Sequence, residues 1–301
     1  MSDQIGSGFP ADRAILFDCF CAFSRRQLET WDIDPMYPVL RWLYASEGLD
    51  RETALWRTYL YVAFYKIASA EEAWAEYPTP QLVDPSPSFR KPTGFERRGF
   101  RGNDRAAYNV NSAYKEAQWH GGFLAWVSAA VGSGGEAGWD RLRSDFQRIS
   151  GNGPWASYKW ADLIKNVHGF PVVASDIGVG GASETAGPIP GMVRLTGQPW
   201  QICATDMMLQ RSLLRKAQAA GVPFDGLDQL ETCLCDFNTL CKGKYYSGHD
   251  IDAMMSGLLP GSAVWLARRE VFDPALLGEL NDWAGVRKDL LRLYSEQGLL
   301  I

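Results

Sequence analysis

The segment that determines the expected fold is residues 150–178, SGNGPWASYKWADLIKNVHGFPVVASDIG. The pattern of apolar residues predicts a helix that ends at Ser150. Gly151 and Gly153 then permit a tight turn, and Pro154 suits the first position of a second helix. Such a helix-hairpin-helix exposes backbone N–H groups at the N-terminus of its second helix. A DNA phosphate can bind to these groups without Lys or Arg.

Helical periodicity recurs in most of the remaining chain, whereas alternating strand patterns are almost absent. It predicts a helix after Pro38 and further helices over residues 11–30, 50–76, 104–130, 138–149, 205–220, 227–241, 250–268 and 273–297. The expected fold is therefore mainly α. We expect residues 1–301 to form a single helical enzyme domain, or two interleaved lobes that divide near residue 180.

The composition is that of a folded globular protein, with 46% hydrophobic and 22% charged residues. The formal net charge of −5 argues against adhesion to nucleic acid across the whole surface, so any DNA contact must be local. Residues 90–105 hold six basic side chains against two acidic ones, and several prolines precede them. This window is either a functional basic loop or a solvated loop with scattered charge.

The six cysteines include no pair at the spacing of a zinc or iron-sulfur knuckle, and the chain has neither a Walker A nor a dinucleotide-binding glycine pattern. We therefore expect no metal, no cofactor, and structural thiols in a reducing compartment. The N-terminus lacks the features of a signal peptide, and no apolar run reaches the length of a membrane span. These features predict a cytoplasmic protein without membrane contact.

The hairpin resembles that of helix-hairpin-helix DNA glycosylases. GNGPWAS is similar to their glycine hairpin, and GFPVVASD is similar to the segment that ends in their catalytic aspartate, here Asp176. The spacing from Gly169 to Asp176 is also that of the family. The resemblance implies a glycosylase-like helical fold with the hairpin and aspartate in residues 139–176, and DNA contacts from Gly151, Gly153 and Trp155. Trp155 replaces the lysine of bifunctional glycosylases, which argues against lyase chemistry.

A narrower resemblance covers roughly residues 50–260. ERRGFRGNDRAAYN, the hairpin and CDFNTLCKGKYYSGHDID resemble the phage family of α-glutamyl/putrescinyl thymine pyrophosphorylases, also described as amino acid:DNA transferases. There a 5-hydroxymethyluracil DNA kinase phosphorylates the base, and the transferase replaces the (pyro)phosphate with an amine. The resemblance implies DNA carrying 5-phosphomethyluracil-type bases, a free amino acid or polyamine, a functional link to such a kinase, and the host cytoplasm as location if the chain is phage-encoded.

The implied reaction is a substitution at the exocyclic methylene of the base, and its departing phosphate needs cations. We expect these to be Arg97, Arg98, Arg101 and Arg105, and in second place Lys242 and Lys244. Stabilisation of a helix C-terminus is an equal alternative for the two lysines. For the carboxylate of an incoming amino acid we expect Arg105 or Lys115. Beside them on one helix face we expect Asn103, Asn109, Asn111 and Tyr114, which a solvated helix surface explains equally well.

The incoming amine needs a base that takes its proton. Asp176 is the first candidate by position, with capping of the next turn as the alternative. A second polar group consists of Asp236, His249, Asp250 and Asp252, although a single His is more often structural than catalytic. A flipped base would stack on aromatic side chains, for which the candidates are Trp119, Trp155, Trp160 and Tyr246. None of the cysteines has the basic surroundings of a covalent nucleophile.

Two other functions fit the same sequence. The first is a monofunctional DNA glycosylase, which would release a free base. The second is a helix-hairpin-helix module that binds DNA without catalysis.

Overall fold

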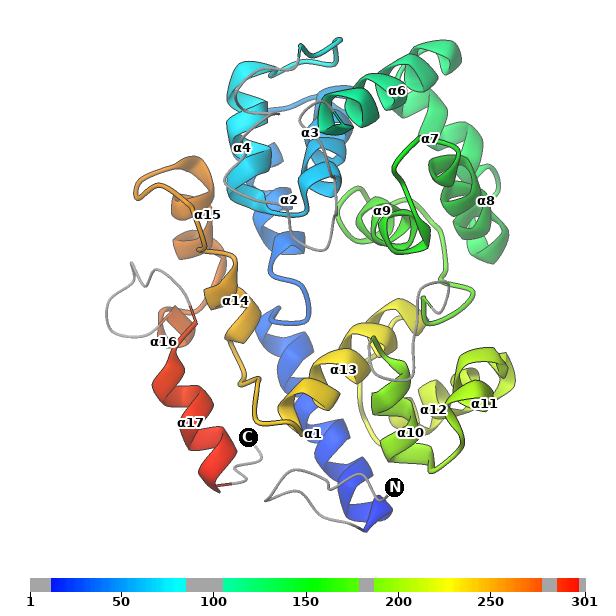
Figure 1. Ribbon diagram of the computed structural model, residues 1–301, viewed down its shortest axis with the longest axis vertical. Helices are drawn as coiled ribbons and strands as arrows, with labels where there is room; N and C mark the ends of the chain where they lie inside the picture. The colour runs from blue at the N-terminus through cyan, green and yellow to red at the C-terminus, as the bar shows by residue number, and fades with distance from the viewer. Residues whose placement is uncertain (1–11, 85–104, 179–186, 278–285, 298–301) are drawn as a thin grey trace. The chain divides into compact units, whose positions relative to one another are not determined.

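The computed structural model describes residues 12–84, 105–178, 187–277 and 286–297, and its regular structure is helical (Figure 1). No strand occurs in these ranges, where Gly135 and Val172 form an isolated parallel bridge. The prediction of a mainly α fold is confirmed, whereas the glycosylase-like arrangement and the domain boundaries stay predictions. None of the described helices combines the length and the apolar character that crossing a membrane requires.

The chain divides into two compact units, which we describe separately. Unit 1 is drawn from Met1–Pro35, Ala174–Ala253 and Phe272–Ile301. Its helices are α1 (Arg13–Thr30), α10 (Ile189–Thr196), α11 (Trp200–Thr205), α12 (Met207–Ala219), α13 (Leu227–Leu240), α14 (His249–Ala253), α16 (Pro274–Leu277) and α17 (Lys288–Gln297).

Unit 2 is drawn from Met36–Val173 and Met254–Val271. Its helices are α2 (Met36–Ser46), α3 (Arg51–Phe64), α4 (Ile67–Glu76), α6 (Arg105–His120), α7 (Phe123–Val131), α8 (Gly135–Gln147), α9 (Pro154–Asn166) and α15 (Ala263–Val271).

The centre of unit 2 is α3, which is buried on all sides from residue 54 onward. Asp50 caps its start by accepting a hydrogen bond from the Thr53 N–H at 3.0 Å. The Tyr59 ring lies 5.8 Å from the rings of both Phe123 and Trp160. Because aromatic pairs at this separation stabilise a core beyond simple area burial, these contacts hold α3 against α7 and α9.

Four segments predicted as single helices are interrupted. One is residues 273–297, where α16 ends at Leu277 and α17 begins at Lys288. Residues 50–76 break between α3 and α4 at Tyr65, whose φ of 47° is left-handed. Residues 104–130 break at Gly121 and Gly122, with φ of 91° and 123°. Residues 250–268 break between α14 and α15. A residue with positive φ cannot continue a right-handed helix, and apolar periodicity alone does not reveal it.

The start of α2 also differs from the prediction. The helix begins at Met36, before Pro38 and not after it. Proline is tolerated in the first turn of a helix, where its missing N–H would have no partner in the helix.

The predicted hairpin turn lies in unit 2, between α8 and α9. Gly151 has φ of 90°, Gly153 precedes the first residue of α9, and Pro154 occupies the predicted first position. From α6, Asn109 donates hydrogen bonds to the Ser150 carbonyl at 2.7 Å and to Asn152 Oδ1 at 3.0 Å. Asn109 is only 1% exposed, so it anchors the turn. The prediction that places it on a substrate-binding or solvated helix face is wrong.

The core of unit 1 forms where α1, α10 and α13 pack together. The Phe20 ring of α1 meets the Phe237 ring of α13 edge-on at 5.4 Å. On α10, a Cβ added at Gly191 would lie 2.2 Å from the Leu234 carbonyl oxygen of α13. Glycine is therefore required for the two helix backbones to approach this closely.

Replacing Asn109 with Ala should lower the free energy of unfolding by about 2 kcal/mol or more, because buried partners around the turn lose their hydrogen bonds. Urea unfolding measures the change. Ser112→Ala on the same helix is the control, since the Ser112 hydroxyl bonds only to the Tyr108 carbonyl of its own helix. Equal stability of the two variants would contradict an anchoring role.

Candidate active site

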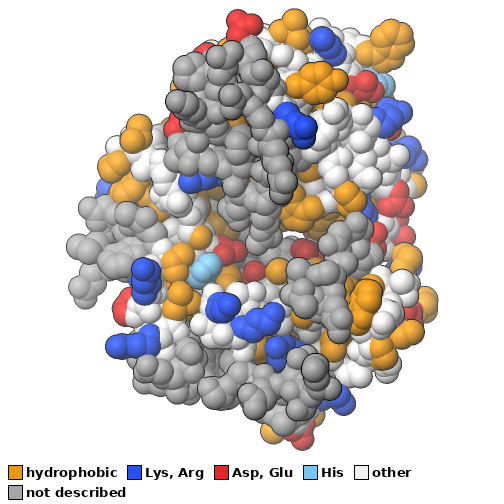
Figure 2. Space-filling model, viewed as in Figure 1, with side chains coloured by type: hydrophobic (Ala, Val, Ile, Leu, Met, Phe, Trp, Pro, Cys, Tyr) orange, Lys and Arg blue, Asp and Glu red, His pale blue; other side chains and the backbone are white. Residues whose placement is uncertain are grey.

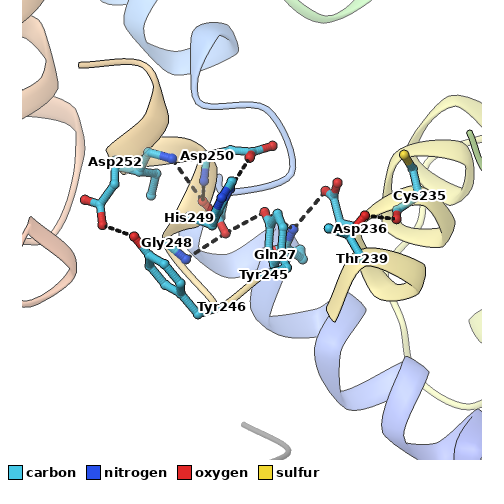
Figure 3. A network of polar contacts seen from close by, with 12 residues as sticks. Gln27, Cys235, Asp236, Thr239, Tyr245, Tyr246, Gly248, His249, Asp250 and Asp252 are labelled. Carbon is cyan, nitrogen blue, oxygen red and sulfur yellow. Dashed lines mark hydrogen bonds and ion pairs between the residues drawn. The ribbon is translucent and has the colours of Figure 1, made fainter. Parts of the chain in front are cut away.

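Polar side chains in unit 1 gather where α1, α13 and the segment between α13 and α14 meet (Figure 3). We call this group the Asp32 cluster, and its members are Gln27, Asp32, Asp236, Tyr245, His249 and Asp250. Gln27 comes from α1 and Asp236 from α13. Asp32 follows α1 directly, because Trp31 has a left-handed φ of 61° that ends the helix.

Asp32 is the most connected member of the cluster and is 0% exposed. Its Oδ2 accepts hydrogen bonds from the Tyr245 hydroxyl at 2.9 Å and from the Gly248 N–H at 2.7 Å. Its Oδ1 accepts from the N–H groups of Asp250 and Ile251, both at 3.1 Å. One buried carboxylate thus fixes the segment 245–251 and satisfies backbone N–H groups at the start of α14.

Gln27 connects Asp236 to the rest of the cluster. Its Nε2 donates to Asp236 Oδ2 at 3.2 Å and to the Tyr245 hydroxyl at 2.9 Å. Tyr245 therefore accepts from Gln27 and donates to Asp32. Asp236 is buried, and the hydrogen bond from Gln27 holds its carboxylate in a defined orientation.

His249 and Asp250 form a pair at the outer side of the cluster. His249 Nδ1 lies 2.8 Å from Asp250 Oδ1, and the His249 side chain is 21% exposed. If Nδ1 donates to Asp250, Nε2 carries the lone pair that can accept a proton. Figure 2 shows a His side chain near the middle of the view with Asp or Glu side chains beside it and Lys or Arg side chains below it.

The pKa values of two cluster members are shifted. Burial raises the pKa of Asp32 to about 7, and the negative charge of Asp250 adds to the rise. Burial acts to lower the pKa of His249, but its hydrogen bond and charge interaction with Asp250 outweigh burial and raise the pKa above 6.5. Both groups can therefore exchange a proton near neutral pH, as general acids and bases do.

Asp252 and Tyr246 form hydrogen bonds with each other and with Arg287. Asp252 Oδ2 accepts hydrogen bonds from the Tyr246 hydroxyl at 2.5 Å and from Arg287 Nε at 2.7 Å. The Arg287 N–H also donates to the Tyr246 hydroxyl at 2.8 Å. Tyr246 is 0% exposed, so its ring has no open face. The structure contradicts the prediction that Tyr246 stacks on a base or binds substrate.

Lys242 and Lys244 are exposed just beyond Leu240, the last residue of α13. They belong to the same segment as Tyr245 and His249. This position suits phosphate binding and also places positive charge at the helix C-terminus, so both interpretations stay open.

Asp176 is half-buried in unit 1, and its Oδ1 accepts a hydrogen bond from the Gly178 N–H at 2.6 Å. This is the local turn contact that the alternative interpretation predicts. The role of Asp176 as a base stays a prediction.

The predicted stacking residues of unit 2 differ in exposure. Trp160 is 1% exposed and stacks on Phe146 at 5.1 Å, so it is part of the core and the prediction is wrong for this residue. Trp155, beside the hairpin turn, is half-buried with its ring 4.3 Å from that of Tyr65. Trp119 is 86% exposed.

The predicted cations lie partly outside the described residues. Arg105 and Lys115 are exposed on α6 in unit 2. Asn111 of α6 binds the Val83 backbone through hydrogen bonds of 2.7 and 2.8 Å, and Tyr114 is half-buried. The residues that lie outside the described ranges are Arg97, Arg98, Arg101 and Asn103.

No group of three His, Cys, Asp or Glu side chains that could hold a metal ion occurs in the described part of the chain. The six cysteines form no disulfide. Burial raises the pKa of the Cys233 and Cys241 thiols, which disfavours the nucleophilic thiolate.

Sequence reasoning missed Asp32, Gln27 and Tyr245. Asp32 and Gln27 are common residues without a local motif, whereas Tyr245 lies next to Tyr246 inside CDFNTLCKGKYYSGHDID, where nothing in the sequence distinguishes its role. The hydrogen bond from Gln27 to Tyr245 joins positions 218 residues apart. The only usable signal was an acidic residue placed directly after a predicted helix end.

Residues 28–246 match the family model described as amino acid:DNA transferase. The match includes Asp32, Asp236 and Tyr245, whereas Gln27 and His249 lie just beyond its ends. No curated protein matches the chain.

Replacing Asp32 with Ala should lower the free energy of unfolding by about 3 kcal/mol or more, because several buried donors lose their acceptor at about 1–3 kcal/mol each. Urea unfolding tests this, with Asp18→Ala on the exposed side of α1 as control. A loss no larger than in the control would show that the carboxylate does not hold the segment 245–251.

The pH dependence of stability provides a separate test of the Asp32 shift. The folded pKa of about 7 lies above the value in an unfolded chain, so the stabilisation is complete at acidic pH and is lost as the pH rises through 7. Between about pH 4 and pH 7 the free energy of unfolding should fall by up to about 1.4 kcal/mol per pH unit, and the contribution of Asp32 should level off above pH 7. Asp32→Asn should reduce this slope, leaving a remainder of the same sign from His249. An unchanged slope would contradict the shift.

Proposed function

Because the chain belongs to the amino acid:DNA transferase family, we propose that it modifies a 5-(pyro)phosphomethyluracil base in DNA. The amine of an amino acid, glycine-like in size, or of a polyamine attacks the exocyclic methylene carbon. A C–N bond forms, the C–O bond to the phosphate or pyrophosphate breaks, and the ammonium product loses a proton to a base. The protein must therefore bind an ammonium, accept a proton and stabilise a departing phosphate.

The observation that carries this proposal is the His249–Asp250 pair in the Asp32 cluster. Asp250 holds the ring at 2.8 Å, and Asp32 fixes the backbone that bears both residues. His249 is half-buried, with a pKa above 6.5, so it is suited to accept a proton close to neutral pH. We assign it the role of general base for the amine.

Asp236 is suited to bind the incoming ammonium. Its carboxylate accepts a hydrogen bond from Gln27 Nε2 at 3.2 Å, which fixes its orientation, and its negative charge complements that of an ammonium group. Asp176, with its carboxylate in a turn of unit 1, is the second candidate for either role.

The departing phosphate would be stabilised by Lys242 and Lys244, which follow α13 in the segment that ends at the His249–Asp250 pair. Arginines of the 90–105 window are proposed for the same task. The hairpin turn at Gly151 and Gly153 would bind a DNA phosphate through backbone N–H groups at the start of α9, because Gly153 is exposed and no side chain caps that helix.

The proposed substrate requires an earlier reaction. A 5-methylene phosphate on uracil in DNA must come from a kinase that acts on 5-hydroxymethyluracil in DNA. We therefore propose a functional link to such a kinase, in a phage that modifies its thymine within the host cytoplasm.

Replacing His249 with Gln should lower the rate of amine transfer about a hundredfold, which is within the usual contribution of a general base. The assay incubates DNA containing 5-phosphomethyluracil with a mixture of amino acids and measures nucleoside masses. In the wild type the rate should rise with pH through the raised pKa of His249, because the base must be unprotonated. The rate of the His249→Gln variant should not show this rise with pH.

His120→Gln is the matched control, because His120 is a half-exposed histidine of unit 2 next to Glu116. It should keep the wild-type rate and pH profile. A free base in the products, with no gain of mass on the nucleoside, would identify a glycosylase and refute the proposed transfer. A wild-type pH profile in His249→Gln would refute the role of His249 alone.

A further inference from the structure

One face of α6 in unit 2 combines exposed aromatic and cationic side chains. Positions three and four residues apart lie on one side of a helix, and this stripe consists of Arg105, Tyr108, Ser112, Lys115 and Trp119. We call it the outer stripe of α6. Tyr108 is 62% and Trp119 86% exposed, and Arg105 and Lys115 are exposed as well. In Figure 2, hydrophobic and Lys or Arg side chains lie side by side over the region where Figure 1 draws α6.

The composition of the stripe differs from that of an ordinary solvated helix face. Single exposed apolar residues are common, but a tryptophan and a tyrosine in line with two cations form a surface that can bind a ligand. The carboxylate that borders the stripe, Glu116, is paired with Arg148 at 3.3 Å, and the chain as a whole has a net charge of −5. A local basic and aromatic surface is what an acidic protein needs to bind a polyanion with planar bases.

The stripe lies next to the hairpin turn within unit 2. Asn109, on the neighbouring face of α6, holds the turn through the Ser150 carbonyl at 2.7 Å. Farther along the same face, Glu116 pairs with Arg148 at 3.3 Å, just before the turn. These two contact positions lie roughly a quarter turn of helix away from the outer stripe. The turn and the stripe are therefore neighbouring parts of one unit.

We propose that the outer stripe of α6 binds the DNA strand next to the phosphate held by the hairpin turn. Arg105 and Lys115 contact phosphates, and Trp119 stacks on an unpaired base. The proposal rests on the proposed function in taking DNA as the ligand and adds the surface that receives it. Arg105 and Lys115 lie ten positions apart, about 15 Å along the helix, which corresponds to roughly four base steps of duplex DNA.

The test measures binding of the full-length protein to two fluorescein-labelled duplexes by anisotropy, at several salt concentrations and without amino acid. One duplex is fully paired, and the other carries an unpaired thymine at its centre. Trp119→Ala should weaken binding to the second duplex about five- to a hundredfold, which is the range for loss of one base stack, and should affect the paired duplex less. The slope of log affinity against log salt should stay unchanged in this variant, because no charge is removed.

Lys115→Gln should weaken binding to both duplexes alike. It should also reduce the slope of log affinity against log salt by about 0.9, the value for one lost phosphate contact. The matched controls lie on α15 of the same unit, where Leu266 is 48% exposed and Arg269 is exposed. Leu266→Ala and Arg269→Gln should bind like the wild type.

Wild-type binding by both stripe variants would overturn the proposal, as would equal losses in the α15 controls. Sedimentation tests whether a second copy of this chain, and not DNA, occupies the stripe. A wild type that is dimeric and a Trp119→Ala variant that is monomeric would make the stripe an interface between two copies and also overturn the proposal. Because binding is measured without turnover, a protein that shows these effects but transfers no amine would refute the proposed reaction alone.

Discussion

The arrangement of unit 1 depends on the buried carboxylate of Asp32. Removing a carboxylate from water is unfavourable unless hydrogen bonds replace its hydration, and Asp32 obtains them from Tyr245 and from three backbone N–H groups. The donors come from the other end of the sequence, so the carboxylate can be satisfied only when α1 and the segment 245–251 are in place. The same contacts fix the backbone on which the His249–Asp250 pair is presented.

Unit 2 uses a neutral side chain in the same way. Asn109 is buried, and its amide connects α6 to the hairpin turn and, through the Tyr59 hydroxyl at 3.0 Å, to the central helix α3. In both units a buried polar group fixes the backbone of a segment that connects two helices. Such groups contribute to a specific conformation because any other arrangement leaves them without partners.

Helical content was predictable from the sequence because apolar spacing reports a buried face directly. Helix ends were less predictable, since Tyr65 gives no signal of its left-handed conformation, and Gly121 and Gly122 lie inside a segment whose apolar spacing is helical. Within the candidate site, His249, Asp236 and the lysines that follow α13 could be selected by chemistry and by resemblance. Asp32 and Gln27 could not, because their importance arises from partners about two hundred residues away. The sequence also did not reveal which aromatic side chains are exposed, as the burial of Tyr246 and Trp160 shows.

The break between α3 and α4 has a consequence for how the sequence can change during evolution. Tyr65 holds a left-handed φ of 47°, a conformation that glycine would adopt with less strain. Glycine, however, would remove the ring that meets Trp155 edge-on at 4.3 Å beside the hairpin turn. The same ring also lies 5.3 Å from that of Tyr61 and 5.9 Å from Lys159 Nζ, so a glycine that relieves the strain would remove several contacts at once.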